Sequence, residues 1–106
     1  MEREIKELIL IYNKGLKKDA LIRANILIKK YPNTPFILNI IGMINIDFHE
    51  YEKAIDFFSK SIALNKDFSE AYNNKGTALH YLGRLKEAIN SFKIAIKLKP
   101  KYFSAY

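Results

Sequence analysis

Apolar residues recur along this chain at intervals of three and four, the spacing that places them on one face of an α-helix. One clear run consists of Leu85, Ala88, Ile89, Phe92, Ala95 and Ile96. No segment of useful length alternates apolar and polar residues, so strands are not expected. Together with the turn residues between the runs, the pattern predicts six helices, over residues 2–14, 17–30, 35–48, 51–64, 69–82 and 85–98.

The helical pattern itself repeats with a period of 34 residues. When the sequence is shifted by 34, Ala20, Ala54 and Ala88 fall into one column, and Gly42 falls on Gly76. A fixed period of this length is typical of a solenoid, whose units bury their apolar faces by stacking on one another. Each unit is therefore predicted to be two antiparallel helices.

The glycines serve two different purposes in this pattern. Gly42 and Gly76 lie in the middle of predicted helices, where glycine costs about 1 kcal/mol relative to alanine. That cost is understandable if a side chain at these positions would hold the two helices of a pair apart. The alanine column would then be the surface of the second helix that faces the glycine. Gly15 and Gly83 follow a first helix, where a left-handed residue ends it. His49 holds the same place, so either it takes positive φ or the turn differs there.

These residues and their spacing resemble the tetratricopeptide repeat family. The resemblance is most complete in the third unit, at Tyr72, Gly76, Leu79, Gly83, Leu85, Ala88, Phe92, Ala95 and Pro100. It implies an all-α fold, an α-solenoid in which antiparallel helix pairs form a right-handed superhelix. It also implies a single domain over residues 1–106, with repeats at 1–34, 35–68 and 69–102 and the start of a truncated fourth repeat at 103–106.

Four residues depart from the family pattern. Glu4 and Glu7 fill usually apolar positions of the first helix, which indicates that this helix forms a solvent-exposed N-terminal edge of the array. Asn45 and Lys75 fill usually apolar positions inside it. We expect Asn45 to be hydrogen-bonded if buried, and Lys75 to lay its stem along the core with its amine in water.

The resemblance implies a concave groove, lined by the first helices of successive units, that binds an extended peptide or a helix. Groove-facing positions carry over from every unit, Asn13 and Glu70 among them, and the candidate binding residues are Ile5, Ile9, Asn39, Met43, Asp47, Asn73, Asn74, Thr77 and His80. An amide-rich groove can hydrogen-bond a ligand backbone, and its isoleucines and methionine can take an aliphatic anchor. The alternative is that these residues are only the solvated faces of three helices.

Some members of the family grip the C-terminal carboxylates of heat-shock chaperones with Lys and Asn side chains. The matching positions here are Ile5, Ile9, Ile40, Glu70 and Asn74. Only Asn74 suits a carboxylate, and Glu70 would repel one. We therefore predict that this chain does not bind chaperone tails in that way.

The net charge of +7 raises the question of a nucleic-acid partner. Many of the lysines occupy or follow the predicted second helices, which form the convex side of such a solenoid: Lys17, Lys18, Lys29, Lys30, Lys53, Lys60, Lys86, Lys93, Lys97, Lys99 and Lys101. Spread lysines with few arginines are typical of a solvated face. A nucleic-acid partner is therefore not favoured.

The composition narrows the chemistry further. The chain has no cysteine, which excludes disulfides, thiolate catalysis and cysteine-ligated zinc and fits a cytoplasmic location. No apolar run is long enough to span a membrane. His49 and His80 are not spaced as metal ligands, and no catalytic constellation or cofactor motif is found. We predict no catalytic residue, no metal and no cofactor.

The last residues repeat the opening of the third unit, so the C-terminal face of the array is expected to lack its capping helix. Ile89, Phe92 and Ile96 should then be partly bare, which suggests a homodimer through this face. Three hypotheses follow. The first is a noncatalytic protein–protein interaction scaffold, the second a fragment of a longer array that mainly self-associates, and the third a basic nucleic-acid-associated module.

Overall fold

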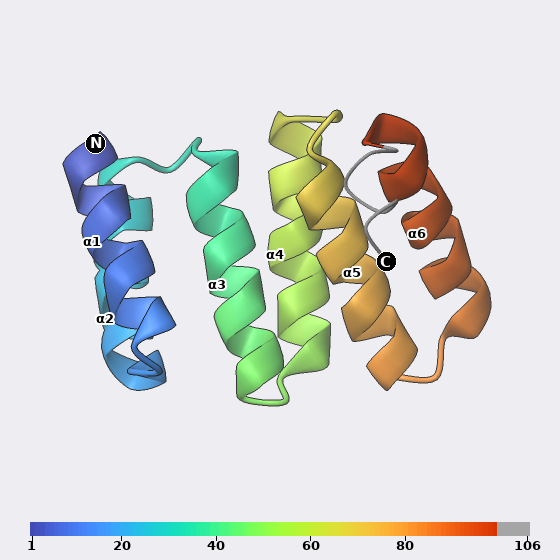
Figure 1. Cartoon of the computed structure of the whole chain (residues 1–106), viewed down its shortest axis with the longest axis horizontal. Coiled ribbons are helices and arrows are strands. Elements are labelled where there is room, and N and C mark those ends of the chain that lie inside the picture. Colours follow the sequence, from blue (N-terminus) through green and yellow to red (C-terminus); the bar gives the residue numbers. More distant parts are fainter. Residues whose placement is uncertain (100–106) are drawn as a thin grey trace.

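The computed structural model describes residues 1–99, which form six α-helices in three antiparallel pairs (Figure 1). The three pairs follow one another along the molecule, with the first pair, in which α1 overlaps α2 in this view, at one end and α6 at the other. Their bounds are α1 Glu2–Asn13, α2 Lys17–Lys30, α3 Pro35–Asp47, α4 Tyr51–Leu64, α5 Ser69–Tyr81 and α6 Leu85–Leu98. The predicted all-α solenoid is confirmed, while the predicted fourth unit at 103–106 lies outside the described residues.

The predicted helix ends agree with the structure to within one residue. The second helix of each pair has the predicted bounds, and the first helix ends one residue early, at Asn13, Asp47 and Tyr81. In each case the next residue still donates its backbone N–H to the helix, so the difference is one of assignment at a fraying end.

The turn within each pair is closed by a residue of positive φ. Gly15 has φ +81° and Gly83 has φ +77°, and a Cβ at either would meet no atom within 4 Å. Glycine is therefore favoured at these two sites for its backbone conformation rather than for lack of space. His49 takes φ 61° at the corresponding site, so of the two alternatives positive φ is the one adopted. Its N–H reaches the carbonyl of Ile46, and that of Glu50 reaches Asn45, the double bond of a Schellman motif.

The mid-helix glycines lie beneath the ring of a phenylalanine on the paired helix. A Cβ on Gly42 would come within 2.4 Å of the Phe58 ring, and one on Gly76 within 2.8 Å of the Phe92 ring. The expected close approach is thus present. However, the group that fills the space is the phenylalanine ring, rather than the alanine column that the sequence pointed to.

The first unit exchanges the sizes at this contact. Leu8 stands in the column of Gly42, and Ala24 stands in the column of Phe58. Leu8 and Ala24 are both fully buried in one hydrophobic cluster with Ile37, Ile41 and Ile44. A large residue on the first helix thus accompanies a small one on the second, which keeps the filled volume similar.

The four departures from the repeat pattern have local explanations. Glu4 accepts hydrogen bonds from the Tyr31 hydroxyl at 2.6 Å and the Lys30 amine at 3.2 Å, which tie α1 to the end of α2. The Tyr31 hydrogen bond first, and then Lys30, hold the pKa of Glu4 below its usual value. Glu7 pairs with Arg23 at 3.1 Å. Asn45 is buried and donates to the carbonyl of Ile41, as expected, and Lys75 is half-buried.

Candidate functional site

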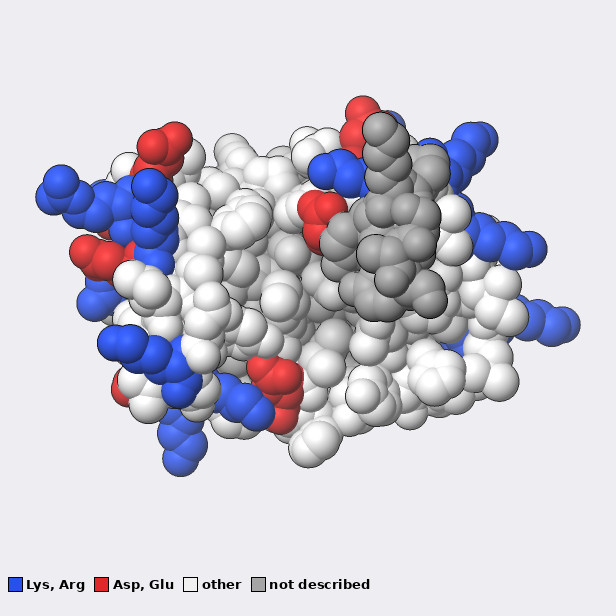
Figure 2. Space-filling model, in the orientation of Figure 1, with Lys and Arg blue, Asp and Glu red and all other residues white. Residues whose placement is uncertain are grey.

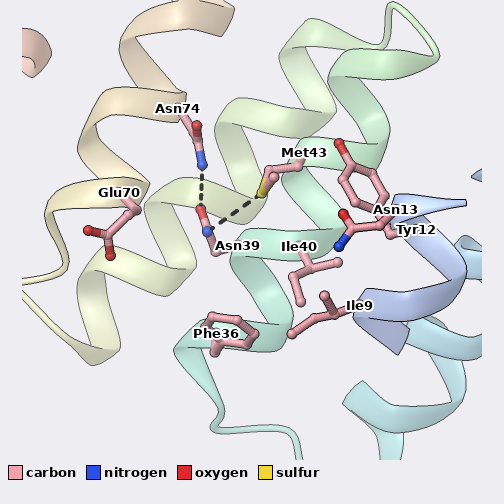
Figure 3. A pocket seen from close by; sticks show the side chains of 9 residues that line it. All are labelled: Ile9, Tyr12, Asn13, Phe36, Asn39, Ile40, Met43, Glu70 and Asn74. Atoms are coloured by element: carbon pink, nitrogen blue, oxygen red, sulfur yellow. Dashed lines mark hydrogen bonds between the residues drawn. The ribbon is translucent and has the colours of Figure 1, made fainter. Parts of the chain in front are cut away.

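The first helices of the three pairs enclose a pocket of about 290 Å³ (Figure 3). It is open to solvent on one side, and α1, α3 and α5 all contribute to it. Its lining consists of Ile9, Tyr12, Asn13, Phe36, Asn39, Ile40, Met43, Glu70 and Asn74. Because three successive units meet here, the pocket is a product of their stacking rather than of any one helix pair.

The apolar part of the pocket comes from α1 and α3. Ile40 is 5% exposed and belongs to the core, where Ile9 packs against it. Met43 is half-buried, while Phe36 keeps 40% of its surface exposed. A wall with fixed isoleucines, a flexible methionine and a partly free aromatic ring suits an inserted apolar side chain.

An amide pair crosses the pocket from α3 to α5. Asn74 donates its Nδ2 to Oδ1 of Asn39 at 3.0 Å, and Asn39 directs its own Nδ2 to the sulfur of Met43 at 3.8 Å (Figure 3). Asn39 is only 4% exposed. The predicted groove residue Asn39 therefore lies in the pocket, but its amide is engaged within the protein, and Asn74 is the more accessible of the two.

A second polar contact links α1 to α3 at the other side of the pocket. The Tyr12 hydroxyl donates to Oδ2 of Asp47 at 2.8 Å. Burial first, and then the hydrogen bond and negative charge of Asp47, raise the pKa of Tyr12 to about 12. Tyr12 thus remains neutral at physiological pH and orients the Asp47 carboxylate.

Glu70 stands at the opposite rim. Its carboxylate accepts a hydrogen bond from the Ser69 hydroxyl at 3.0 Å and lies 3.9 Å from the Lys99 amine. With 35% of its side chain exposed, Glu70 remains accessible to a ligand.

Four of the nine predicted groove residues line the pocket, namely Ile9, Asn39, Met43 and Asn74. Ile5 packs against the core, and Asp47 is held by Tyr12. The others continue along α5 beyond the pocket. Thr77 donates to the carbonyl of Asn73 at 3.1 Å, and His80 is exposed beside Tyr81.

Sequence reasoning missed Tyr12 and Phe36. The signal was available in the repeat register, because Tyr12 occupies the column of His80 and Phe36 that of Glu70. Applying each groove position to all three units would have found both.

Charge is unevenly spread over the face seen in Figure 2. Lys and Arg side chains gather over α1 and α2 at one end and over α6 at the other, while the middle over α3 is largely uncharged. Acidic groups lie at the border of this uncharged area. The pocket therefore opens onto a largely uncharged surface with acidic groups at its border, in a protein of net charge +7.

The described residues offer little else for chemistry. Among residues 1–99 no group of three or more His, Asp or Glu side chains could hold a metal ion. His49 places Nδ1 2.7 Å from the Tyr51 hydroxyl, so it serves the turn rather than a ligand site. In the same range, no helix has the length and apolar character needed to cross a membrane.

Comparison with known sequences identifies the repeat. Two family models described as tetratricopeptide repeat match residues 37–68 and 69–102. Photosystem I assembly protein Ycf3 of Acaryochloris marina is 31% identical over 83 residues, which cover 65% of this chain and 50% of that protein. Superkiller protein 3 of Saccharomyces cerevisiae is 29% identical over 88% of this chain but only 6% of its own length. The chain thus spans half or less of these relatives.

Solved structures share the fold. MamA is 27% identical with a TM-score of 0.89, over 99% of this chain and 61% of that one. The Arabidopsis OM64 TPR domain is 22% identical with a TM-score of 0.91, over 98% and 86%. The first TPR of Spaghetti (RPAP3), solved with the HSP90 peptide SRMEEVD, is 20% identical with a TM-score of 0.88, over 94% and 79%.

Proposed function

Because the chain belongs to the tetratricopeptide repeat family, we propose that it is a noncatalytic scaffold that binds a peptide or helix of a partner protein across α1, α3 and α5. The observation that carries this proposal is the apolar pocket between these three helices. Pockets of this kind, with an apolar wall and a few convergent polar groups, are the usual sites for an anchoring side chain.

The lining suggests the chemistry of the ligand. A large apolar side chain would occupy the space beside Ile9, Phe36 and Met43. The exposed amide of Asn13 and the outer edge of Asn74 would hydrogen-bond the ligand backbone, since an amide side chain offers both donors and an acceptor. Binding would then depend on the anchor residue more than on the rest of the ligand sequence.

We further propose that this groove rejects acidic C-terminal peptides of the kind seen in the RPAP3 complex. Three of the five positions that matter in the chaperone-tail clamp are isoleucines here, and Glu70 holds a fourth. A carboxylate brought against Glu70 would meet like charge and lose its hydration, and the nearby Lys99 amine already faces the Glu70 carboxylate.

Peptides selected from a random displayed library against the immobilised chain supply the probes for a test. Calorimetry with each selected peptide compares the unaltered chain with the Phe36→Ala and Met43→Lys variants, both changed inside the pocket. We expect both to weaken binding about tenfold or more, because anchor contacts dominate such interfaces.

Leu64→Lys is the matched control, since Leu64 is 46% exposed on α4 and does not line this pocket. Peptides that bind all of these variants equally well would contradict the proposal. Tight binding of SRMEEVD itself would contradict the rejection of acidic tails while leaving the scaffold role intact.

A second candidate, self-association as part of a longer array, is favoured by the exposed side of α6. Leu85 and Ile89 are each 53% exposed and Ile96 is 46% exposed, whereas Phe92 is half-buried over Gly76. A further helix packed on α6 would cover these residues, as α5 covers the half-buried Ile55 of α4 in the preceding pair.

A further inference from the structure

Three residues on the outside of the first unit are apolar where the second unit is charged. Leu16 is 47% exposed, Ile22 is 61% exposed and Ile26 is 57% exposed. Shifted by one period, the same three positions hold Glu50, Asp56 and Lys60, all of them exposed.

This exposure is not a consequence of standing at the end of the row. Leu10 is exposed because of its place at the end of the row. It is 60% exposed, whereas its counterparts Ile44 and Ala78 in the next two units are fully buried by the preceding unit. A helix pair packed before α1 would cover Leu10 in the same way. The positions of Leu16, Ile22 and Ile26 differ, because their counterparts remain exposed in the second unit, which has a neighbour on each side.

The three residues form one continuous surface. They line a shallow groove of about 370 Å³ together with Ile11 of α1 and the charged pair Asp19 and Arg23 of α2. Arg23 extends toward α1, where its guanidinium lies 3.1 Å from Glu7. Among residues 1–99, Asp19 has no cation within 4 Å. We call Leu16, Asp19, Ile22, Arg23 and Ile26 the α2 stripe.

The α2 stripe is complementary to itself. Leu16 and Ile26 lie five residues on either side of Leu21, and Asp19 and Arg23 lie two residues on either side of it. In an antiparallel pair of α2 helices related by a two-fold axis beside this point, Leu16 of one copy would face Ile26 of the other. Asp19 would face Arg23 of the second copy, and the two Ile22 side chains would meet near the axis. A two-fold interface requires this kind of self-matching patch.

We propose that the α2 stripe is a self-association surface, through which two copies of this chain pair antiparallel along α2. The occupant is a second copy because the charged positions and the apolar positions match under one and the same two-fold axis. The surface is separate from the pocket between α1, α3 and α5, so a dimer of this kind leaves both pockets open. A contact limited to one helix from each copy is small, so the dimer is weak and concentration-dependent.

Site-directed cross-linking tests the pairing directly, because the chain has no cysteine of its own. In the Ile22→Cys variant the two sulfurs would lie near the axis, within reach of a disulfide. Leu64→Cys on α4 is the matched control, being similarly exposed at 46% and outside both the α2 stripe and the bare side of α6. Under mild oxidation of the 106-residue chain we expect the Ile22→Cys variant to form a covalent dimer about tenfold faster or more. Equal rates, or faster cross-linking through the α4 position, would overturn the proposal.

The register has its own test. A mixture of the Leu16→Cys and Ile26→Cys variants should cross-link mainly to the mixed dimer, while each alone should cross-link slowly. Preferential formation of the like-with-like dimers would show that the helices do not pair antiparallel in this register, and would overturn it.

Sedimentation equilibrium completes the test without a covalent bond. The Ile22→Asp, Ile26→Lys double variant copies Asp56 and Lys60 of the second unit, so its fold is already accommodated by this architecture. Across about a hundredfold range of concentration we expect the unaltered chain to dimerise and this variant to remain monomeric. A monomeric unaltered chain over the whole range would refute the proposal, and so would a variant that dimerises equally well. Peptide binding in the groove should be unchanged in the variant, which separates the failure of one proposal from that of the other.

Discussion

The polar side chains of the pocket show how one residue can be placed correctly and still act differently from expectation. The repeat register predicted that Asn39 lies in the groove, and it lines the pocket. Its bonding was not predictable, because its partner Asn74 is 35 residues away on α5. Asn39 also directs its Nδ2 to the Met43 sulfur, so its amide is engaged within the protein. The half-buried Asn74 is the member of the pair left to meet a ligand.

Tyr12 provides a prediction at the same scale. In the unfolded chain tyrosine ionises near its ordinary pKa of 10.0, and in the folded chain Tyr12 does so at about 12. Its contribution to the free energy of unfolding is therefore complete below pH 10.0 and decreases as the pH rises toward 12. Denaturation measured against pH should show this alkaline loss in the unaltered chain and a smaller loss in Tyr12→Phe.

At neutral pH the same substitution should cost about 1 kcal/mol, because the hydrogen bond to Asp47 is lost. A spectroscopic titration of tyrosinate supplies the direct check. The group that ionises at about 12 should disappear in the variant, and its persistence would assign the high pKa to another tyrosine.

At the scale of helices, the sequence predicted the number of helices in the described part of the chain and where each one begins and ends. Period, turn glycines and Pro35 mark the ends of the helices, so the bounds differ from the structure by at most one residue. The packing between helices was predicted less well. The sequence showed that Gly42 needs a close neighbour, but several small and large residues could face it. Only the structure identifies that neighbour as the Phe58 ring.

The size exchange between units gives a prediction about helix pairing. Gly42→Leu should destabilise the fold by about 1–3 kcal/mol or more, because the new side chain would overlap the Phe58 ring. Phe58→Ala alone should cost about 3–5 kcal/mol by leaving a cavity. The double variant recreates the Leu8 and Ala24 arrangement of the first unit, and should be more stable than the sum of the two losses implies.

Chemical denaturation of the four proteins in this double-mutant cycle measures the coupling. We expect a favourable coupling of about 0.5–3 kcal/mol. Additive losses would show that the two columns do not compensate each other. Leu64→Ala on the exposed side of α4 gives the background cost of a surface truncation.

At the scale of the whole molecule, three apolar surfaces emerge from a strongly basic protein. They are the pocket, the α2 stripe and the bare side of α6. The sequence predicted part of the pocket lining, and it predicted the bare side of α6 from Ile89, Phe92 and Ile96, because both surfaces depend on the repeat register. It did not indicate the α2 stripe, since apolar residues within an amphipathic pattern are readily assigned to the core. Their exposure becomes evident only when the neighbouring helices are in place.

Net charge determines how ionic strength should act on the dimer. Each copy carries +7, so two copies repel each other at long range, and the facing Asp19 and Arg23 pairs are exposed and contribute little. Added salt screens the repulsion while leaving the apolar contact intact. Sedimentation at rising salt should therefore show tighter dimerisation. Weaker dimerisation would indicate an interface held mainly by ion pairs.

The exchange of sizes at the glycine column also distinguishes the first helix pair from the other two. If α1 paired with α4, Leu8 would be pressed against Phe58, and if α3 paired with α2, the absent side chain of Gly42 would leave a hole beside Ala24. Both errors are penalised, one by overlap and the other by a void. A chain built from units that share one helix-pair architecture risks assembling them in the wrong combination as it folds. Here the sizes in the first unit favour the pairing of α1 with α2 over the pairing of either helix with one from the second unit.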